Sequence, residues 1–267
     1  MMLLSQAASA MNGRLLGADA QFLSVGTDSR KVSRSELFFA LKGDHFDGHQ
    51  YAEQALKQGA VAVVVSDETC EVRPAILVKD TLLALGELAK AWRSRFSVPV
   101  VAVTGSNGKT TIKEMIHAIL NSKTGHPDAV HATVGNLNNH IGLPLTLLKM
   151  RKYHQYAVLE MGMNHLGEID YLTRIAQPTV AVIGNAGTAH IGELGSRDNI
   201  AKAKGEIFAG LDHDGVAVIN ADDAYAEYWC GLNASRKIVT FGIEINADVS
   251  AQHVENNGLG IMSLSTP

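Results

Sequence analysis

The residues best suited to chemistry lie in one short stretch, 100–111, which reads Val-Val-Ala-Val-Thr-Gly-Ser-Asn-Gly-Lys-Thr-Thr. Its β-branched run predicts a buried strand that ends at Thr104, and a glycine-containing loop follows. A helix is expected next, because apolar residues recur there at helical spacing. These residues are Ile112, Met115, Ile116, Ile119 and Leu120. A strand, a glycine loop and a helix in this order are typical of loops that bind the phosphates of a nucleoside triphosphate.

Each part of this loop has an expected role. Glycines let backbone N–H groups approach phosphate oxygens, and the helix N-terminus adds partial positive charge. Lys109 would neutralise the β- and γ-phosphates, and the Thr110 hydroxyl would bind Mg²⁺. The residues expected to bind the nucleotide are Gly105, Ser106, Asn107, Gly108, Lys109, Thr110 and Thr111. The usual motif has a glycine where this chain has Val103, so an ordinary turn before a helix is the alternative.

Strand and helix signals alternate from residue 98 onward, which predicts an α/β domain with a mostly parallel sheet covered on both faces. Ligands bind such sheets at the carboxyl ends of the strands. Glu160 ends the apolar strand 156–159 and is expected to be a Mg²⁺ ligand, unless it only begins a loop. Asn185 and His190 follow the strand 179–183 and would lie at the same edge.

A lysine falls on the apolar face of the helix predicted over 199–211. The other residues of this face are Ile200, Ala203, Ile207, Phe208 and Leu211. Lys204 must therefore extend to solvent, meet a charge or be modified. A desolvated, uncharged amine can react with CO₂ to give a carbamate, which is an anionic oxygen ligand for a metal. The sequence leaves extension to solvent and a functional role open.

Residues 1–80 predict a smaller α/β domain, and residues 81–267 the domain with the glycine loop. Helices are expected over 3–11 and 51–58, and strands over 22–25, 37–41, 61–65 and 75–78. Asp80 can cap the helix that follows, over 82–96. Two polar loops in the first domain could bind a phosphate or a sugar, or could be solvated turns. Their candidate residues are Asp28, Ser29, Arg30, Lys42, Gly43, Asp47 and His49.

Two stretches of the second domain, 135–142 and 161–168, are unusually polar. Asparagine amides both donate and accept hydrogen bonds, so they suit a sugar or peptide ligand better than a core. The candidates here are Asn136, Asn138, Asn139, Asn164 and His165.

Composition narrows the class of protein. The 267 residues carry a formal net charge of −4, so nucleic acid and anionic membranes are not expected partners. Cys70 and Cys230 are far apart and have no metal-binding spacing, which predicts reduced thiols in a cytoplasmic protein. No apolar run is long enough to span a bilayer, and we interpret the N-terminus as a helix and not as a signal peptide.

Taken together, these motifs resemble the Mur ligase superfamily, which includes the folylpolyglutamate synthases. The resemblance rests on the loop 104–111, Glu160, Asn185 with His190, and Ala-Lys-Gly-Glu-Ile-Phe at 203–208. The superfamily has the same short form of the phosphate loop, which accounts for Val103. Within it, the stretches 135–142, 160–165 and 201–208 resemble the ligases that add D-alanyl-D-alanine to UDP-MurNAc-tripeptide.

The resemblance implies a reaction in which ATP converts the tripeptide carboxylate to an acyl phosphate, which the amine of D-alanyl-D-alanine then attacks. It implies one Mg²⁺ at Thr110 and Glu160, and a second beside Glu160, His190 and a carbamoylated Lys204. Lys109, Asn185 and these groups would be catalytic, and the first domain would bind UDP. We expect a monomer without nucleic acid or membrane partners.

Members of this superfamily have a third domain that we do not find in this sequence, so we expect the 267-residue chain to be a fragment that is inactive alone. The alternatives are a sibling ligase such as a folylpolyglutamate synthase, a P-loop kinase or hydrolase, and a non-catalytic nucleotide-binding module. A buried Lys204 would argue against the kinase or hydrolase.

Overall fold

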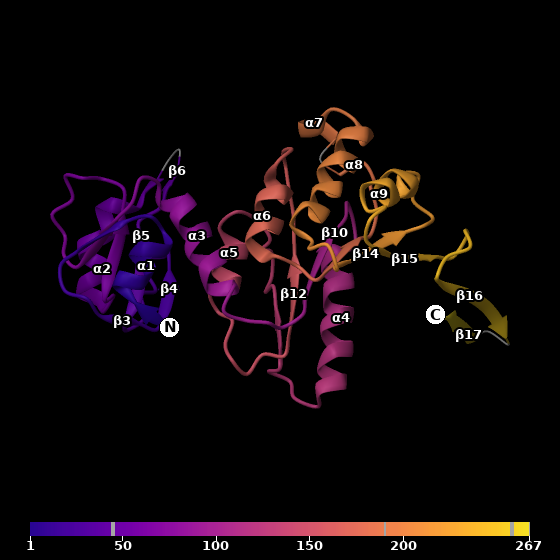
Figure 1. Cartoon of the computed structure of the whole chain (residues 1–267), viewed down its shortest axis with the longest axis horizontal. Helices are drawn as coiled ribbons and strands as arrows, with labels where there is room; N and C mark the ends of the chain where they lie inside the picture. Colours follow the sequence, from indigo (N-terminus) through magenta and orange to yellow (C-terminus); the bar gives the residue numbers. More distant parts are fainter. Residues whose placement is uncertain (44–45, 190, 257–258, 267) are drawn as a thin grey trace. The chain divides into compact units, whose positions relative to one another are not determined.

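The computed structural model describes residues 1–43, 46–189, 191–256 and 259–266. The chain forms two compact units, one made of residues 1–97 and 140–151 and the other of residues 98–139 and 152–267. Figure 1 shows their helices and strands along the chain. No helix in the described part of the chain has both the length and the apolar character needed to cross a bilayer.

The first unit is built on a five-stranded sheet with the order β2-β9-β8-β5-β4. Its strands are β2 (Arg14–Leu16), β4 (Ser24–Gly26), β5 (Glu36–Phe39), β8 (Ala62–Val65) and β9 (Ala75–Leu77). All neighbours are parallel except β2 and β9. Two short antiparallel pairs accompany the sheet: β1 (Met2–Leu3) with β3 (Gln21–Phe22), and β6 (Lys42–Gly43) with β7 (Phe46–Asp47). The strand predicted over 22–25 is therefore divided between two sheets.

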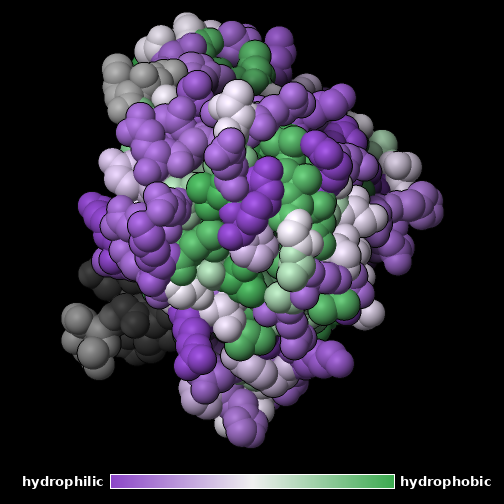
Figure 2. All heavy atoms as spheres, turned by 90° about the vertical axis from the view of Figure 1, so that its left-hand side faces the viewer, coloured by the Kyte–Doolittle hydropathy of each residue, from purple (hydrophilic) through white to green (hydrophobic). Residues whose placement is uncertain are grey.

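Helices of the first unit are α1 (Leu4–Ala10), α2 (Ala52–Gln58), which follows the 3₁₀ turn η1 (Gly48–Tyr51), α3 (Thr81–Arg93) and α5 (Gly142–Leu147). One side of the unit shows apolar side chains surrounded by hydrophilic ones (Figure 2). Partly buried apolar residues pack against the core beneath α2, namely Val32, Leu56, Cys70, Val72 and Leu77. Apolar packing of α2 on the sheet thus provides one part of the core of this unit.

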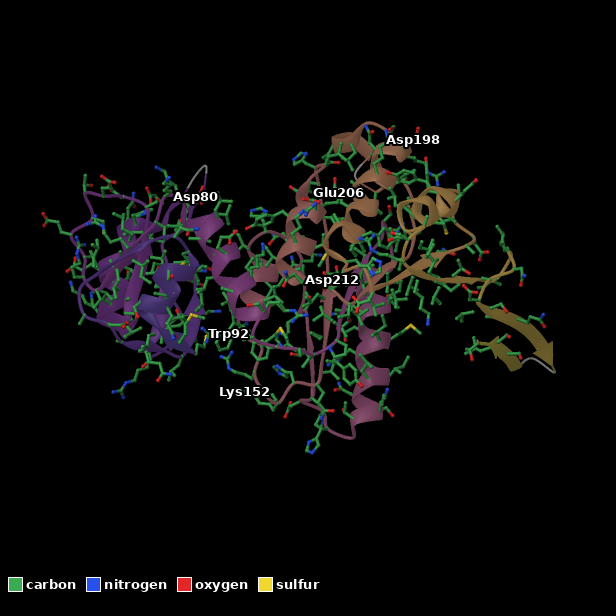
Figure 3. All side chains as sticks on the ribbon, viewed as in Figure 1. Asp80, Trp92, Lys152, Asp198, Glu206 and Asp212 are labelled. Atoms are coloured by element: carbon green, nitrogen blue, oxygen red, sulfur yellow. The ribbon has the colours of Figure 1, made fainter. Side chains whose placement is uncertain are left out.

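The division of the chain differs from the boundary expected at residue 80. Asp80 caps α3 as predicted, since its carboxylate accepts hydrogen bonds from the backbone N–H groups of Leu82 (2.7 Å) and Leu83 (2.9 Å). Near the other end of α3, the Trp92 indole N–H donates to the carbonyl of Met150 at 3.1 Å (Figure 3). Contacts of α3 with α1 and α5 therefore place α3 and residues 140–151 in the first unit.

The second unit contains an eight-stranded sheet with the order β11-β12-β10-β13-β14-β15-β16-β17. The strands are β10 (Val100–Thr104), β11 (Val130–Ala132), β12 (Tyr156–Glu160), β13 (Val180–Ile183), β14 (Val216–Asn220), β15 (Lys237–Gly242), β16 (Val249–Asn256) and β17 (Leu259–Ser265). Only β17 pairs antiparallel to its neighbour, so the predicted mostly parallel sheet is confirmed.

The helices of the second unit are α4 (Lys109–Thr124), α6 (Glu168–Ala176), α7 (Ile191–Leu194), α8 (Arg197–Gly205) and α9 (Ala226–Leu232), with a 3₁₀ turn η2 (Glu206–Gly210). The helix predicted over 199–211 therefore ends at Gly205 and continues as η2. Its predicted apolar face is buried in full. The stripe predicted on α4 is partly wrong, because Met115 and Ile119 are 60% and 65% exposed. Lys113 occupies the buried side of α4 in their place.

Candidate functional site

The phosphate-type loop lies where the sequence predicts it, between β10 and α4. Val103 is buried near the end of β10, where it pairs with Glu160 on one side and Val182 on the other. Position 103 is therefore part of the strand, and the loop begins at Gly105. The departure from the usual motif does not disturb the loop.

Gly108 and Lys109 fix the conformation of the loop. Gly108 has a φ of 75°, a left-handed conformation that favours glycine, and it is the first residue before α4. The Lys109 ammonium donates to the carbonyls of Gly105 (2.8 Å) and Ser106 (3.2 Å). Burial lowers the pKa of Lys109, and the negative charge of Glu160 opposes this shift. The loop therefore already holds one cation at the start of a helix, where an anion is favoured.

Asn185, which follows β13, braces the loop. Its amide oxygen accepts from the Asn107 N–H and its amide nitrogen donates to the Asn107 carbonyl, both at 3.0 Å. Its carbonyl accepts from the Ser106 N–H at 2.9 Å, and the Ser106 hydroxyl accepts from the Gly187 N–H at 2.9 Å. The two strand ends are thus fastened together, and Asn185 acts on the loop that would hold the phosphates.

Glu160 lies at the end of β12 with its carboxylate beside the loop. It is 2% exposed, and its two oxygens accept from the Thr110 hydroxyl and the Asn138 amide, each at 2.8 Å. Adjacent ligands of an octahedral Mg²⁺ are about 2.9 Å apart, so the Thr110 and Glu160 oxygens fit one hard cation. Within the described residues, no group of three or more His, Cys, Asp or Glu side chains could hold a metal. A site of two protein oxygens suits Mg²⁺, which takes its remaining ligands from water and substrate phosphates.

Lys204 is buried in α8, so it does not extend to solvent. Lys204 is only 2% exposed. Among the described residues, its ammonium has no hydrogen-bonding or ion-pair partner. Burial, and next the charge of Lys109, lower the pKa of Lys204 to about 7. Lys202, two residues earlier, is exposed. The remaining predicted member, His190, lies outside the described residues.

The three asparagines of the stretch 135–142 have different surroundings. Asn138 binds Glu160, and its carbonyl accepts from the Gly162 N–H at 2.9 Å, so it is part of the carboxylate site. Asn136 and Asn139 are exposed beside it. They remain candidates for contact with a ligand.

The segment carrying Asn164 and His165 is held by carboxylates. Their backbone N–H groups donate to Glu168 at 2.6 and 3.3 Å, and both side chains are exposed. Glu206 accepts from the N–H groups of Gly167 (2.7 Å) and Asp170 (3.2 Å) at the start of α6 (Figure 3). Burial raises the pKa of Glu206. The two exposed side chains are thus presented from an ordered loop.

The first predicted polar loop forms part of the wall of a cavity of about 440 Å³ in the first unit. It is lined by Thr27, Asp28, Ser29, Arg30, Phe46 and Tyr51. Arg30 pairs with Asp28 at 2.8 Å, and this hydrogen-bonded pair lowers the pKa of Asp28 to about 2. Phe46 and Tyr51 stack with ring centroids 5.8 Å apart. The sequence analysis missed these two rings, although Phe46 stands within the second predicted polar loop and Tyr51 follows two residues after its end.

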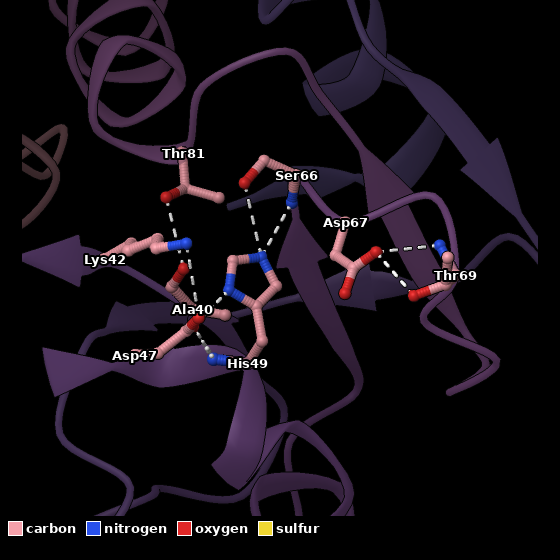
Figure 4. A network of polar contacts seen from close by, with 8 residues as sticks. All are labelled: Ala40, Lys42, Asp47, His49, Ser66, Asp67, Thr69 and Thr81. Carbon is pink, nitrogen blue, oxygen red and sulfur yellow. Dashed lines mark hydrogen bonds and ion pairs between the residues drawn. The ribbon is translucent and has the colours of Figure 1, made fainter.

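Hydrogen bonds within the second predicted polar loop and from Ser66, outside it, hold this loop (Figure 4). The Ser66 N–H donates to His49 Nε2 at 2.9 Å, so the ring proton is on Nδ1, which donates to Asp47 at 2.6 Å. Lys42 lies 3.7 Å from the other oxygen of Asp47 and, like Gly43, is exposed. His49 and Asp47 therefore shape this loop, whereas Lys42 and Gly43 face solvent.

Two family models match the chain. Residues 103–266 match the Mur ligase middle domain, and residues 21–93 match the Mur ligase family, catalytic domain. The UDP-N-acetylmuramoyl-tripeptide--D-alanyl-D-alanine ligase of Escherichia coli is 44% identical over 267 residues, which is 99% of this chain and 58% of that protein.

Solved structures agree with this similarity. A crystal structure of MurF from Acinetobacter baumannii has a TM-score of 0.89 and 38% identity, and covers 98% of this chain and 58% of its own. MurF ligase from Thermotoga maritima in complex with ADP has a TM-score of 0.82 and 34% identity, covering 91% and 56%. The chain therefore spans little more than half the length of these relatives.

Proposed function

Because the chain belongs to the Mur ligase family, we propose that it forms the UDP-binding and ATP-binding parts of a peptidoglycan-precursor ligase. The enzyme would join D-alanyl-D-alanine to UDP-MurNAc-tripeptide and release UDP-MurNAc-pentapeptide, ADP and phosphate. The names of the curated relatives support this reaction. The observation that carries the proposal is the 2.8 Å contact between Thr110 and Glu160 directly beside Lys109.

In the first step, a carboxylate oxygen of the tripeptide attacks the γ-phosphorus of ATP, and ADP leaves. The amine of D-alanyl-D-alanine then attacks the acyl carbon, and phosphate and a proton leave as the amide forms. Lys109 and the N–H groups of the loop hold the triphosphate, and Asn185 keeps that loop in place. The main task of these residues is to bring a carboxylate and a polyanion together.

Thr110 and Glu160 would hold the Mg²⁺ that accompanies ATP. When bound, this ion neutralises negative charge between the carboxylate and the phosphates. Glu160, His190 and a carbamoylated Lys204 are proposed for a second Mg²⁺. Asn136, Asn139, Asn164 and His165 are proposed to contact the peptide or sugar.

We predict that Lys204 takes up CO₂ as pH rises through about 7, because that is its lowered pKa and only the neutral amine attacks CO₂. A ¹³C NMR signal of a lysine carbamate should therefore grow between about pH 6 and about pH 8 in ¹³C-labelled bicarbonate. Lys204→Met should remove the signal, whereas Lys202→Met on the exposed side of α8 should keep it. A wild-type chain without the signal at about pH 8 would exclude the carbamate.

The cavity lined by Arg30, Phe46 and Tyr51 is proposed to bind the UDP part of the substrate. Arg30 can donate to a diphosphate, and the two stacked rings offer an apolar surface to a base or sugar. Lys42 and His49 belong to the neighbouring loop, and this loop is proposed to form one edge of the UDP site. The protein is proposed to act as a cytoplasmic monomer, with the two peptide substrates and ATP as its partners.

Calorimetric titration with UDP-MurNAc-tripeptide, and separately with Mg·ATP, tests the proposal. Arg30→Ala should weaken binding of the UDP compound by about 10-fold or more, because it removes charge-assisted hydrogen bonds, and should leave Mg·ATP binding unchanged. The matched control is Arg174→Ala, since Arg174 forms an equally short pair with Asp170 (2.8 Å) in the second unit. Binding of Mg·ATP without any binding of the UDP compound would favour a generic P-loop enzyme.

A further inference from the structure

Lys113 is a buried charge that the proposed reaction does not use. It lies on α4 and is 1% exposed. Its ammonium donates to the Thr133 carbonyl at 2.7 Å and pairs with the Glu114 carboxylate at 2.6 Å. A buried lysine carries a desolvation cost, while Met115 and Ile119 on the same helix are exposed. The helix therefore places a cation at a buried position where an apolar residue would avoid the desolvation cost, and this cation is held by one backbone carbonyl and one carboxylate.

Thr133 connects that lysine to the end of β12. It follows β11 and is 1% exposed. Its N–H donates to the Val158 carbonyl at 3.0 Å, and its hydroxyl oxygen accepts from the Glu160 N–H at 3.0 Å. Its carbonyl accepts from Lys113. All three polar groups of Thr133 are thus used, one toward α4 and two toward β12.

Glu160 is consequently held from two points of the same helix. Thr110 and Lys113 are three residues apart, which places them on one side of α4. Thr110 binds the carboxylate directly, whereas Lys113 fixes the backbone of Glu160 through Thr133. α4 packs against both β11 and β12.

We propose that Lys113, acting through Thr133, is a positioning residue for the carboxylate of Glu160. The inference rests on the proposed function, in which Glu160 and Thr110 bind the metal of the nucleotide. Without the ammonium, the buried Thr133 carbonyl would lack this partner and the strand end would shift to recover one. Without the Thr133 hydroxyl, the Glu160 N–H would lose its acceptor.

Binding of Mn²⁺ in the presence of ATP, followed by electron paramagnetic resonance, tests this proposal without measuring activity. Lys113→Met and Thr133→Val should each weaken Mn²⁺ binding by about 10-fold to 100-fold, as is typical for groups that orient a metal ligand. Thr133→Ser keeps the hydroxyl and should bind Mn²⁺ like the wild type. ATP binding without metal should be the same in every variant, because Lys109 and the loop are unchanged.

The matched control is Thr173→Val, which removes an equally buried threonine hydroxyl in the same unit, bound to the Ile207 carbonyl at 2.7 Å. Thermal unfolding of each variant identifies any loss of folding. Equal Mn²⁺ affinity in Thr133→Val, Thr133→Ser and Thr173→Val would overturn the positioning role and leave the proposed function standing. A folded wild-type chain that retains no Mn²⁺ with ATP would overturn both.

Discussion

Lys109→Met is expected to weaken binding of Mg·ATP by about 30-fold to 1,000-fold, or about 2–4 kcal/mol. The Lys109 ammonium donates to the carbonyls of Gly105 and Ser106, so its loss removes both a loop contact and the positive charge that is proposed to face the phosphates. Part of the cost arises because Glu160, which is buried, loses a neighbouring positive charge. Calorimetric titration with Mg·ATP measures the effect.

Lys202→Met is the control for this experiment. Lys202 lies on the exposed side of α8, so the substitution changes the net charge equally and removes no contact with the loop. Its affinity for Mg·ATP should match that of the wild type. If both variants bind Mg·ATP equally well, the phosphates do not bind at the loop 105–111.

Trp229→Ala is expected to lower the free energy of unfolding of the second unit by about 3–5 kcal/mol, the usual cost of removing a fully buried aromatic side chain. Trp229 in α9 is fully buried, and its indole N–H donates to the Ala201 carbonyl of α8 at 3.0 Å. Its ring also packs closely on Gly205, at the end of the same helix. Thermal unfolding should show a decrease of about 10 °C in the melting temperature.

The neighbouring aromatic residue provides the comparison. Tyr228 is 41% exposed, so Tyr228→Ala should change the melting temperature far less than Trp229→Ala. Because Ala201 and Gly205 flank Lys204 in α8, the Trp229 variant should also lose the carbamate signal expected at Lys204. Similar melting temperatures for the two alanine variants would contradict the role assigned to Trp229.

The sequence predicted the strand, glycine loop and helix of residues 100–124 correctly because that motif is local. A strand, Gly105, Gly108 and the start of α4 are adjacent in the chain, so their order alone indicates how they fold. The burial of Ile200, Ala203 and Ile207 followed from helical spacing for the same reason. The boundary at residue 80 differs from the observed division because α3 packs with α5, some fifty residues further along the chain.

Apolar spacing predicted the buried side of α4 only in part. Ile112, Ile116 and Leu120 pack against the core as expected, whereas Met115 and Ile119, which belonged to the same predicted stripe, are exposed. Lys113 shares that side and finds its acceptor on Thr133, a residue with no motif of its own. A lysine three residues before Ile116 and seven before Leu120 was the available signal.

By itself, the sequence determined the class of fold, the glycine loop between β10 and α4, and the strand ends at which the candidate polar residues lie, because these depend on neighbouring residues and on their period. Only the tertiary structure decided what each polar side chain does. The Asn185 side chain forms hydrogen bonds with Asn107, which lies 78 positions away in the sequence, and Asn138 binds Glu160, which lies 22 positions away. Such pairs form because parallel strands bring their carboxyl ends to one edge of the sheet, and no local pattern records which side chains meet there. Whether Lys204 extends to solvent was also decided by the tertiary structure, in which the residue is only 2% exposed.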